Sequence, residues 1–390
     1  MRSPFALALA FLSCLLFGEI TWPVDAWAQT PAREVSVRGT SIMLDGKPFI
    51  AKGAIFQVFV ETAEQLETCR QTEKYCDRHL EARDFYFGRG KYKGQSGLDV
   101  AKDWGINTIR LNINQAALDL ADPSYSDAYV EELIAATSLA RSRGFVVILA
   151  LFDARNRNTP QTLREANPQT PLDNEVTLAA AKVLARKFGK DKGVMLETLN
   201  EPFSPVRRAT GWLLWRDGGS PRRGRFAGMR LVGVNAVIQA MRDAGATNVV
   251  IVQGLGSFDG FPGGVRDPLN QIVYSVHPFF RDGKAKFIDW NRRFGDFTKS
   301  HPVLITAWGI NWKRSWCDVT GIDKPRQFLQ YLRSKGIGLV VYAMDVPSKL
   351  LWDFRTSREE TTTLGSSCEA RGGIGDLVKS YFTGALPATP

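Results

Sequence analysis

The segment Phe145–Phe152 reads FVVILALF and decides the fold class. All of its residues are apolar, whereas a strand with one face in water alternates apolar and polar side chains. A strand of this composition is buried on both faces, as in a parallel sheet covered by helices. The segment therefore predicts an α/β protein with a parallel sheet.

Seven further segments resemble this strand, and amphipathic segments lie between several of them. The predicted strands are Phe49–Ile55, Thr108–Ile113, Phe145–Phe152, Val194–Leu199, Val249–Gln253, Ile272–Val276, Val303–Thr306 and Leu339–Met344. The predicted helices are Ala128–Arg143, Val176–Phe188, Phe226–Ala244 and Pro325–Lys335. Eight β/α units in about 300 residues predict a closed (β/α)8 TIM barrel, and a doubly wound open sheet is the alternative.

The segments outside the barrel strands predict a hairpin and three long loops. Alternating apolar residues and an Asp45-Gly46 turn predict a short N-terminal β-hairpin over Val35–Lys52. The loops, Val58–Gln95, Ala154–Asn174 and Phe203–Arg225, all follow strands. Barrel enzymes build their sites from such loops, so we expect the functional residues there.

The first 28 residues predict a secretory signal peptide. A basic residue, Arg2, precedes an apolar run, and a small-x-small site follows at Ala26 and Ala28. Glu19 interrupts the run too early for a membrane anchor, and no other stretch is long and apolar enough to span a bilayer. We expect cleavage near Ala28 and a secreted protein, periplasmic or extracellular, with one domain over residues 29–390.

Composition excludes several classes of protein. The chain of 390 residues is 44% hydrophobic and 23% charged, which argues against disorder and against a multi-span membrane protein. Its formal net charge is +10, so an acidic partner is favoured. We expect a monomer with no metal and no cofactor, because no phosphate-binding glycine loop or metal cluster is present.

The four cysteines after the leader predict two disulfides. An even number in a chain bound for an oxidising compartment is typical of bridges, and three connectivities exist. We favour Cys69–Cys76, which share one loop, and Cys317–Cys368, which follow neighbouring strands of a barrel. A zinc site is the weaker alternative, because no Cys-x-x-Cys pair is present.

Polar residues gather at the ends of the predicted strands, which face the mouth of a barrel. The sharpest signal is VMLETLNEPF at Val194–Phe203. In this stretch a buried strand is followed by an amide side chain, Asn200, and then by a carboxylate, Glu201. This stretch resembles the acid/base motif of glycoside hydrolase family 5, the cellulase family of (β/α)8 retaining glycosidases. The resemblance extends to the hairpin, to GINTIR ending at Arg110, to His277 and to HPVLITAWG ending at Gly309.

The resemblance assigns roles to particular residues. It implies that Glu201 is the general acid/base, that Asn200 binds a sugar 2-hydroxyl, and that Arg110 and His277 position the carboxylates. A retaining glycosidase needs two carboxyl groups about 5 Å apart, one to protonate the leaving oxygen and one to attack the anomeric carbon. The implied substrate is a β-linked polysaccharide or oligosaccharide.

The sequence departs from the family pattern at the nucleophile. Strand seven of the family ends in Glu followed by an aromatic residue and Gly, and this chain has Ala307 at the Glu position. A methyl group cannot form a glycosyl-enzyme, so classical retaining activity should be impaired or absent. Phe152, Phe279 and Tyr342 also differ from the usual residues, which favours natural divergence over one engineered change.

Without that carboxylate Arg110 needs another partner, and the sequence offers Glu201, Asp153 or Asp345, water, or an anionic ligand. Asp153 and Asp345 could also act as a displaced base or nucleophile, or simply cap loops. Three functions therefore stay open. They are a glycosidase with a vacated nucleophile position, a non-catalytic glycan-binding protein, and a transglycosylase or hydrolase with relocated chemistry.

Aromatic residues near the mouth are candidate sugar platforms. We expect substrate contacts from Trp308, Tyr342, Phe279 and Asp153, and from Trp212 and Trp215 in the loop after strand four. That loop is also rich in arginine, which suits carboxylate- or phosphate-bearing glycans. A solvated basic surface is the alternative, and we do not expect nucleic acid to bind there.

Overall fold

A computed structural model describes most of the chain after residue 32. The described residues are 33–70, 74–153, 170–206, 208–224, 226–255, 261, 263–281, 289–311, 323–347, 349–355 and 374–386. The predicted signal peptide, residues 1–28, lies outside them.

The predicted closed barrel is confirmed. Eight parallel strands pair in the closed order β11-β13-β4-β5-β6-β7-β8-β9. Their bounds are β4 Lys52–Phe56, β5 Thr108–Asn114, β6 Val146–Phe152, β7 Val194–Glu197, β8 Val250–Gln253, β9 Ile272–Val276, β11 Val303–Trp308 and β13 Gly338–Val341. Two short strands, β10 Phe280–Arg281 and β12 Ile310–Asn311, pair in parallel just beyond β9 and β11. The open-sheet alternative is therefore excluded.

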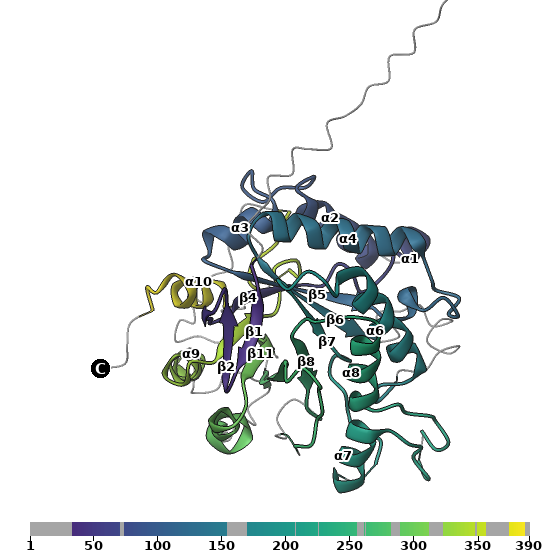
Figure 1. Cartoon of the computed structure of the whole chain (residues 1–390). Coiled ribbons are helices and arrows are strands. Elements are labelled where there is room, and N and C mark those ends of the chain that lie inside the picture. Colours follow the sequence, from purple (N-terminus) through teal and green to yellow (C-terminus); the bar gives the residue numbers. More distant parts are fainter. Residues whose placement is uncertain are drawn as a thin grey trace, which may run out of the picture.

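Helices surround this barrel (Figure 1). Their bounds are α1 Ala63–Arg70, α2 Lys74–Phe87, α3 Gly97–Asp103, α4 Asp127–Ser142, α6 Glu175–Phe188, α7 Arg208–Asp217, α8 Val234–Asp243, α9 Asp323–Lys335 and α10 Gly375–Thr383. Single helical turns lie at Ala116–Leu118, Asn291–Gly295 and Asp296–Lys299. None of the described helices is long and apolar enough to cross a membrane.

Side-chain capping explains where several helices begin. Asn174 Oδ1 accepts a hydrogen bond from the Thr177 amide, and Thr177 Oγ1 accepts one from the Asn174 amide, so α6 begins with a capping box. Ser126 caps α4 in the same way through the Tyr129 amide. The predicted helix Phe226–Ala244 was too long, since α8 begins only after Gly233, whose φ of +76° suits glycine.

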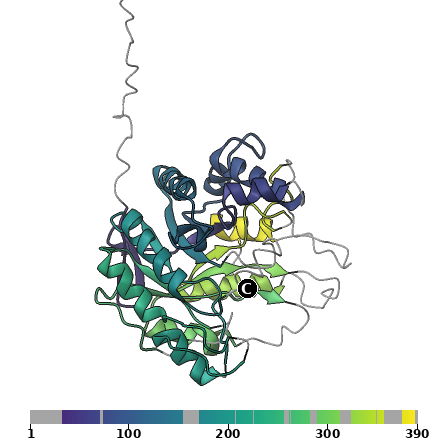
Figure 2. The same cartoon turned by 90° about the vertical axis from the view of Figure 1, so that its right-hand side faces the viewer.

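Two of the segments predicted as loops contain helices. The first, Val58–Gln95, holds α1 and α2, and the loop after β7 holds α7. Figure 2 shows α1 and α2 beside the C-terminal part of the chain, and Phe85 of α2 stacks on Phe354 with ring centroids 5.2 Å apart. These helices were missed because their sequences are strongly polar and carry only a weak apolar stripe.

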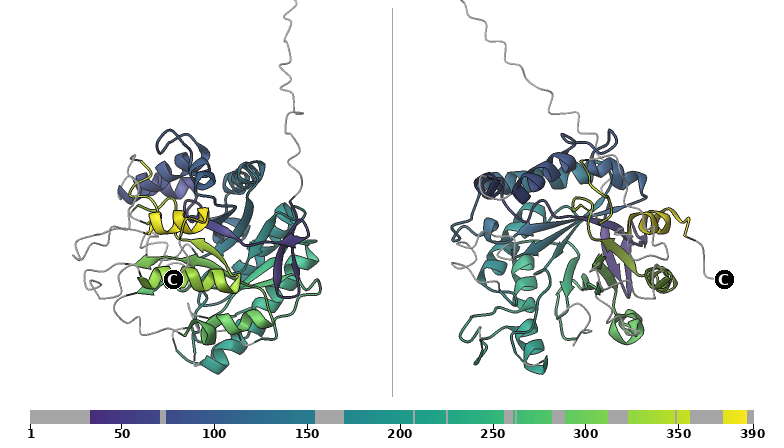
Figure 3. Two further views of the ribbon diagram at one scale, coloured as in Figure 1. Left: turned by 90° about the vertical axis from the view of Figure 1, so that its left-hand side faces the viewer. Right: turned by 180° about the vertical axis from the view of Figure 1, so that it is seen from behind.

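The predicted N-terminal hairpin is a three-stranded antiparallel sheet. Its strands are β1 Val35–Arg38, β2 Ser41–Leu44 and β3 Lys47–Pro48, and the predicted Asp45-Gly46 turn joins the last two. Both turn residues have positive φ, 53° and 75°, as a tight hairpin turn requires. This sheet lies at one end of the barrel (Figure 3), where its buried side chains pack against the barrel interior.

Candidate active site

Strand alternation produces a polar layer inside the barrel. Nearer the N-terminal ends of the strands, interior positions carry apolar side chains, including Met195, Val273 and Leu304. Two residues further along their strands, the inward positions become polar and remain fully buried. The members of this polar layer are Arg110, Glu197, Ser275 and Thr306.

Arg110 forms an ion pair inside this layer with a carboxylate that the sequence analysis missed. Its Nε lies 2.6 Å from Glu197 Oε2, and both side chains have no exposed surface. None of the partners expected for Arg110, Glu201, Asp153 or Asp345, takes this position. A buried charge is tolerated when it is paired and hydrogen-bonded. Glu197 satisfies that condition for Arg110 from β7, two strands away around the barrel.

The other donors of Arg110 hold two amide side chains. Nη1 donates to Asn112 Oδ1 at 2.6 Å, and Nη2 donates to Asn200 Oδ1 at 2.8 Å. Asn112 in turn donates to Gln57 Oε1 at 2.7 Å. Arg110 therefore fixes the orientation of Asn200, the predicted sugar-binding amide, directly before Glu201.

Glu201 stands at the mouth in an unusual backbone conformation. Its φ is +50°, a left-handed value that costs a non-glycine residue about 1–2 kcal/mol. Its backbone N–H donates to Gln253 Oε1 at 2.8 Å, which helps to hold this conformation. The Glu201 side chain is 45% exposed, so its carboxyl group faces the solvent side of the barrel. Gln253 was not singled out from the sequence, although it ends a buried strand.

His277 joins Glu201 to the buried layer. Its Nδ1 lies 3.1 Å from Glu201 Oε1, and its Nε2 lies 2.9 Å from Thr306 Oγ1. The imidazole is almost completely buried and spans the distance between the two groups. The structure thus brings together the predicted acid/base, Glu201, and the three predicted positioning residues, Arg110, Asn200 and His277.

A β-bulge shapes the position of Ala307. Between Ile305 and Trp308, β11 advances three residues while its partner β13 advances two, from Leu339 to Val341. The extra residue lets Thr306 and Ala307 both contact the barrel interior, because a bulge re-aims side chains locally. Ala307 is buried in the interior apolar cluster.

Phe279 and Tyr342 pack against that cluster beside Ala307. Their ring centroids are 6.0 Å apart, and both side chains are only partly buried. Burial raises the pKa of the Tyr342 hydroxyl, and the charges of Asp345 and Glu201 raise it further, so this phenol stays neutral. Both predicted aromatic contacts therefore pack against the interior cluster that contains Ala307.

Asp345 ties the last strand to the first. Its Oδ2 accepts the backbone N–H groups of Gln57 and Val58 at 2.6 and 2.9 Å. Burial raises the pKa of this carboxyl group to about 7. Asp153 has a similar structural task, because its Oδ2 accepts the Thr170 N–H at 2.7 Å and the residue is 5% exposed. These contacts favour the loop-capping interpretation of both aspartates.

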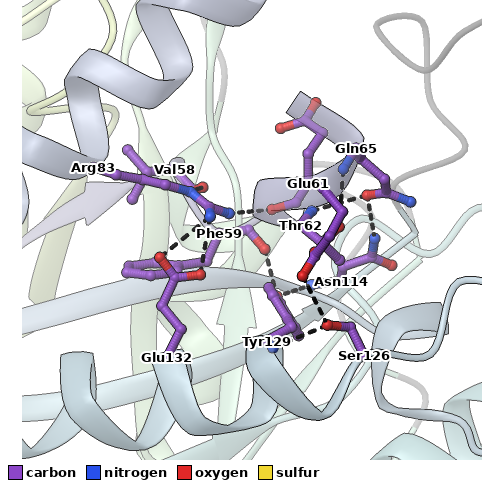
Figure 4. Close-up of polar contacts among 11 residues, drawn as sticks. Val58, Phe59, Glu61, Thr62, Gln65, Arg83, Asn114, Ser126, Tyr129 and Glu132 are labelled. Carbon is purple, nitrogen blue, oxygen red and sulfur yellow. Dashed lines mark hydrogen bonds and ion pairs between the residues drawn. The ribbon is translucent and has the colours of Figure 1, made fainter. Parts of the chain in front are cut away.

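A buried arginine stabilises the loop after β4 (Figure 4). Arg83 donates to the carbonyl oxygens of Val58 and Glu61 and pairs with Glu132 at 2.9 Å. Tyr129 Oη accepts the Asn114 N–H at 2.7 Å and donates to the Phe59 carbonyl. This network holds one wall of the mouth rigidly against α2 and α4.

Two of the three tryptophans expected to form sugar platforms, Trp308 and Trp215, are buried. Trp308 is completely buried and stacks on Phe328 of α9, with ring centroids 5.4 Å apart. Trp215 is also buried and donates its indole N–H to the Gln253 carbonyl, while Trp212 packs edge-on against it. The prediction that Trp308 and Trp215 stack on substrate was wrong, because the alternation after the bulge and the turn of α7 point them into the protein.

Some predictions concern parts of the chain that are not described. The side chains of Cys69 and Cys76 and the residues Cys317 and Cys368 lie outside the described parts, so both disulfides stay predictions. Among the residues that the structure describes, no group of three or more His, Cys, Asp or Glu side chains could hold a metal ion.

A comparison with known protein families identifies the family of this chain. The family model for cellulase, glycosyl hydrolase family 5, matches residues 72–348. The chain belongs to glycosyl hydrolase family 5. A comparison with curated proteins finds no match.

Solved structures show the same fold at low sequence identity. A β-glucanase from Saccharophagus degradans is 17% identical with a TM-score of 0.58, and the match covers 95% of this chain and 99% of that one. A hyperthermophilic endocellulase from the archaeon Pyrococcus horikoshii is 15% identical with a TM-score of 0.56, covering 91% and 99%. The catalytic domain of the major endoglucanase from Xanthomonas campestris is 16% identical with a TM-score of 0.54, and the match covers 90% of this chain and 99% of that one.

Proposed function

We propose that this family 5 protein binds a β-linked glucan across the mouth of its barrel, with Glu201 at the position of the general acid/base. The solved neighbours support this substrate class, since they include a β-glucanase and endocellulases, and one β-glucanase structure contains cellotetraose. We also propose that the protein is secreted after cleavage near Ala28. An anionic glycan is an alternative partner, because the chain has a formal net charge of +10.

The observation that carries the proposal is the asymmetry of the site. On one side Glu201 is held by His277 and Gln253 with its carboxyl group exposed. On the other side Ala307 stands where the family has its nucleophile, packed in an apolar cluster. The protein therefore retains the acid half of the double-displacement mechanism and lacks the half that attacks the anomeric carbon.

Three of the described carboxylates, Glu197, Asp153 and Asp345, do not favour relocated chemistry. Glu197 is sealed inside the barrel with Arg110, and Asp153 and Asp345 are buried and hold backbone amides. For the unmodified chain, the geometry therefore favours a protein that binds a glycan without hydrolysing it.

Reducing-end release from β-glucans, and cellotetraose binding by calorimetry, test the proposal. The unmodified chain should bind without turnover, whereas Ala307→Glu should gain measurable hydrolysis that Ala307→Gln, its uncharged match, lacks. Release by the unmodified chain would show relocated chemistry and contradict the vacated site. Binding without turnover in Ala307→Glu would refute the acid/base role of Glu201, and loss of all binding would refute the substrate class.

A further inference from the structure

We propose that Thr306 is a positioning residue that keeps Nε2 of His277 protonated, so that Nδ1 of His277 and the carboxyl group of Glu201 share a single proton. The inference follows from counting hydrogens in the buried layer. Its consequence for catalysis rests on the proposed function, but the protonation pattern itself does not.

Thr306 has one hydroxyl hydrogen and three polar neighbours. Its Oγ1 lies 2.9 Å from Glu197 Oε1, 2.8 Å from Ser275 Oγ and 2.9 Å from His277 Nε2. A hydroxyl donates once and accepts at two lone pairs. Two of these three neighbours must therefore donate to Thr306, and only one can accept from it.

Glu197 is the neighbour that receives the hydrogen of Thr306. Its carboxylate is ionised opposite the Arg110 guanidinium and can only accept. The other donor near Oε1, Ser275, is 3.5 Å away, so without Thr306 this completely buried oxygen would have only a marginal hydrogen bond. Ser275 then donates to Thr306, and the remaining lone pair of Thr306 must accept a hydrogen from His277 Nε2.

This assignment fixes what Nδ1 of His277 can do. With the hydrogen of a neutral imidazole placed on Nε2, Nδ1 carries a lone pair that points at Glu201 Oε1, 3.1 Å away. Two acceptors at this distance require a proton between them. Either Glu201 is a carboxylic acid that donates to Nδ1, or His277 is an imidazolium that donates to the carboxylate.

The proton between His277 and Glu201 is available for acid catalysis even though the nucleophile position carries no carboxylate. In retaining glycosidases, nearby negative charge keeps the acid protonated. The nucleophile position here is Ala307, which carries no charge. The hydrogen bonds from Glu197 through Thr306 to His277 instead require a proton between His277 and Glu201. Ser275 supports Thr306 by taking one of its lone pairs.

Nitrogen-15 NMR of selectively histidine-labelled protein measures the protonation of each ring nitrogen. The chain has only three histidines, and His79→Gln and His301→Gln variants assign the signals of His277 by elimination. We expect Nε2 of His277 to show the shift of a protonated nitrogen throughout the pH range in which the protein is folded. Thr306→Ser keeps the hydroxyl group and should preserve this pattern, whereas Thr306→Val keeps the shape and should lose it.

The outcomes separate this inference from the proposed function. An unprotonated Nε2 in the unmodified chain, or an unchanged Nε2 signal in folded Thr306→Val, would overturn the role of Thr306. If Thr306→Val fails to fold, Ser275→Ala provides the second comparison. In this variant Glu197 still takes the hydrogen of Thr306, so Nε2 of His277 should stay protonated, and an unprotonated Nε2 would refute the account. None of these spectra depends on glycan binding or on turnover by Ala307→Glu.

Discussion

Arg110 and Glu197 form a buried ion pair in which each charge depends on the other. Glu197→Gln keeps the shape of the side chain but leaves the guanidinium uncompensated, so we expect the free energy of unfolding to fall by about 3–5 kcal/mol. Lys299→Ala, which breaks the exposed pair with Asp296, should lower the free energy of unfolding far less and serves as the control. Urea titration measures both, and equal effects would contradict the buried pairing.

At the scale of an element, β11 attaches to α9 through Trp308 and contributes no sugar platform. Trp308→Ala should lower the free energy of unfolding by about 3–5 kcal/mol because it leaves a large cavity. At a temperature where the variant is folded, its cellotetraose affinity should match that of the unmodified chain. Phe279→Ala should weaken cellotetraose binding and should lower the free energy of unfolding less than Trp308→Ala does. A large loss of affinity in folded Trp308→Ala would restore the platform interpretation.

For the whole molecule, two buried aspartates make stability depend on pH. Burial raises the pKa of both Asp173 and Asp345 to about 7, whereas an unfolded Asp titrates near 3.9. The folded protein therefore binds more protons between these values, and its stability should decrease as pH rises from about 4 to 7. Asp173→Asn with Asp345→Asn replaces both with neutral isosteres and should flatten this slope, with the largest gain above pH 7. Thermal unfolding across this range measures it, and an unchanged slope would show that neither group controls it.

Sequence reasoning reached the closed barrel because buried parallel strands have a strong signal, as in Phe145–Phe152. It also placed Arg110, Glu201 and His277 together, since strand ends converge on one mouth. It missed Glu197 because a carboxylate within an apolar run was counted as part of the strand, although its inward position was itself the signal. It misplaced Trp308 because one extra residue in a bulge reverses the face of each side chain after it, and no residue pattern marks that bulge.

The most direct test of the central claim is a crystal structure of the unmodified chain with cellotetraose. We expect an intact oligosaccharide across the barrel mouth, with a glycosidic oxygen within hydrogen-bonding distance of Glu201 and the adjacent anomeric carbon facing Ala307. Cleaved sugar in the site, a carboxylate opposite the anomeric carbon, or an oligosaccharide bound away from Glu201 would contradict it.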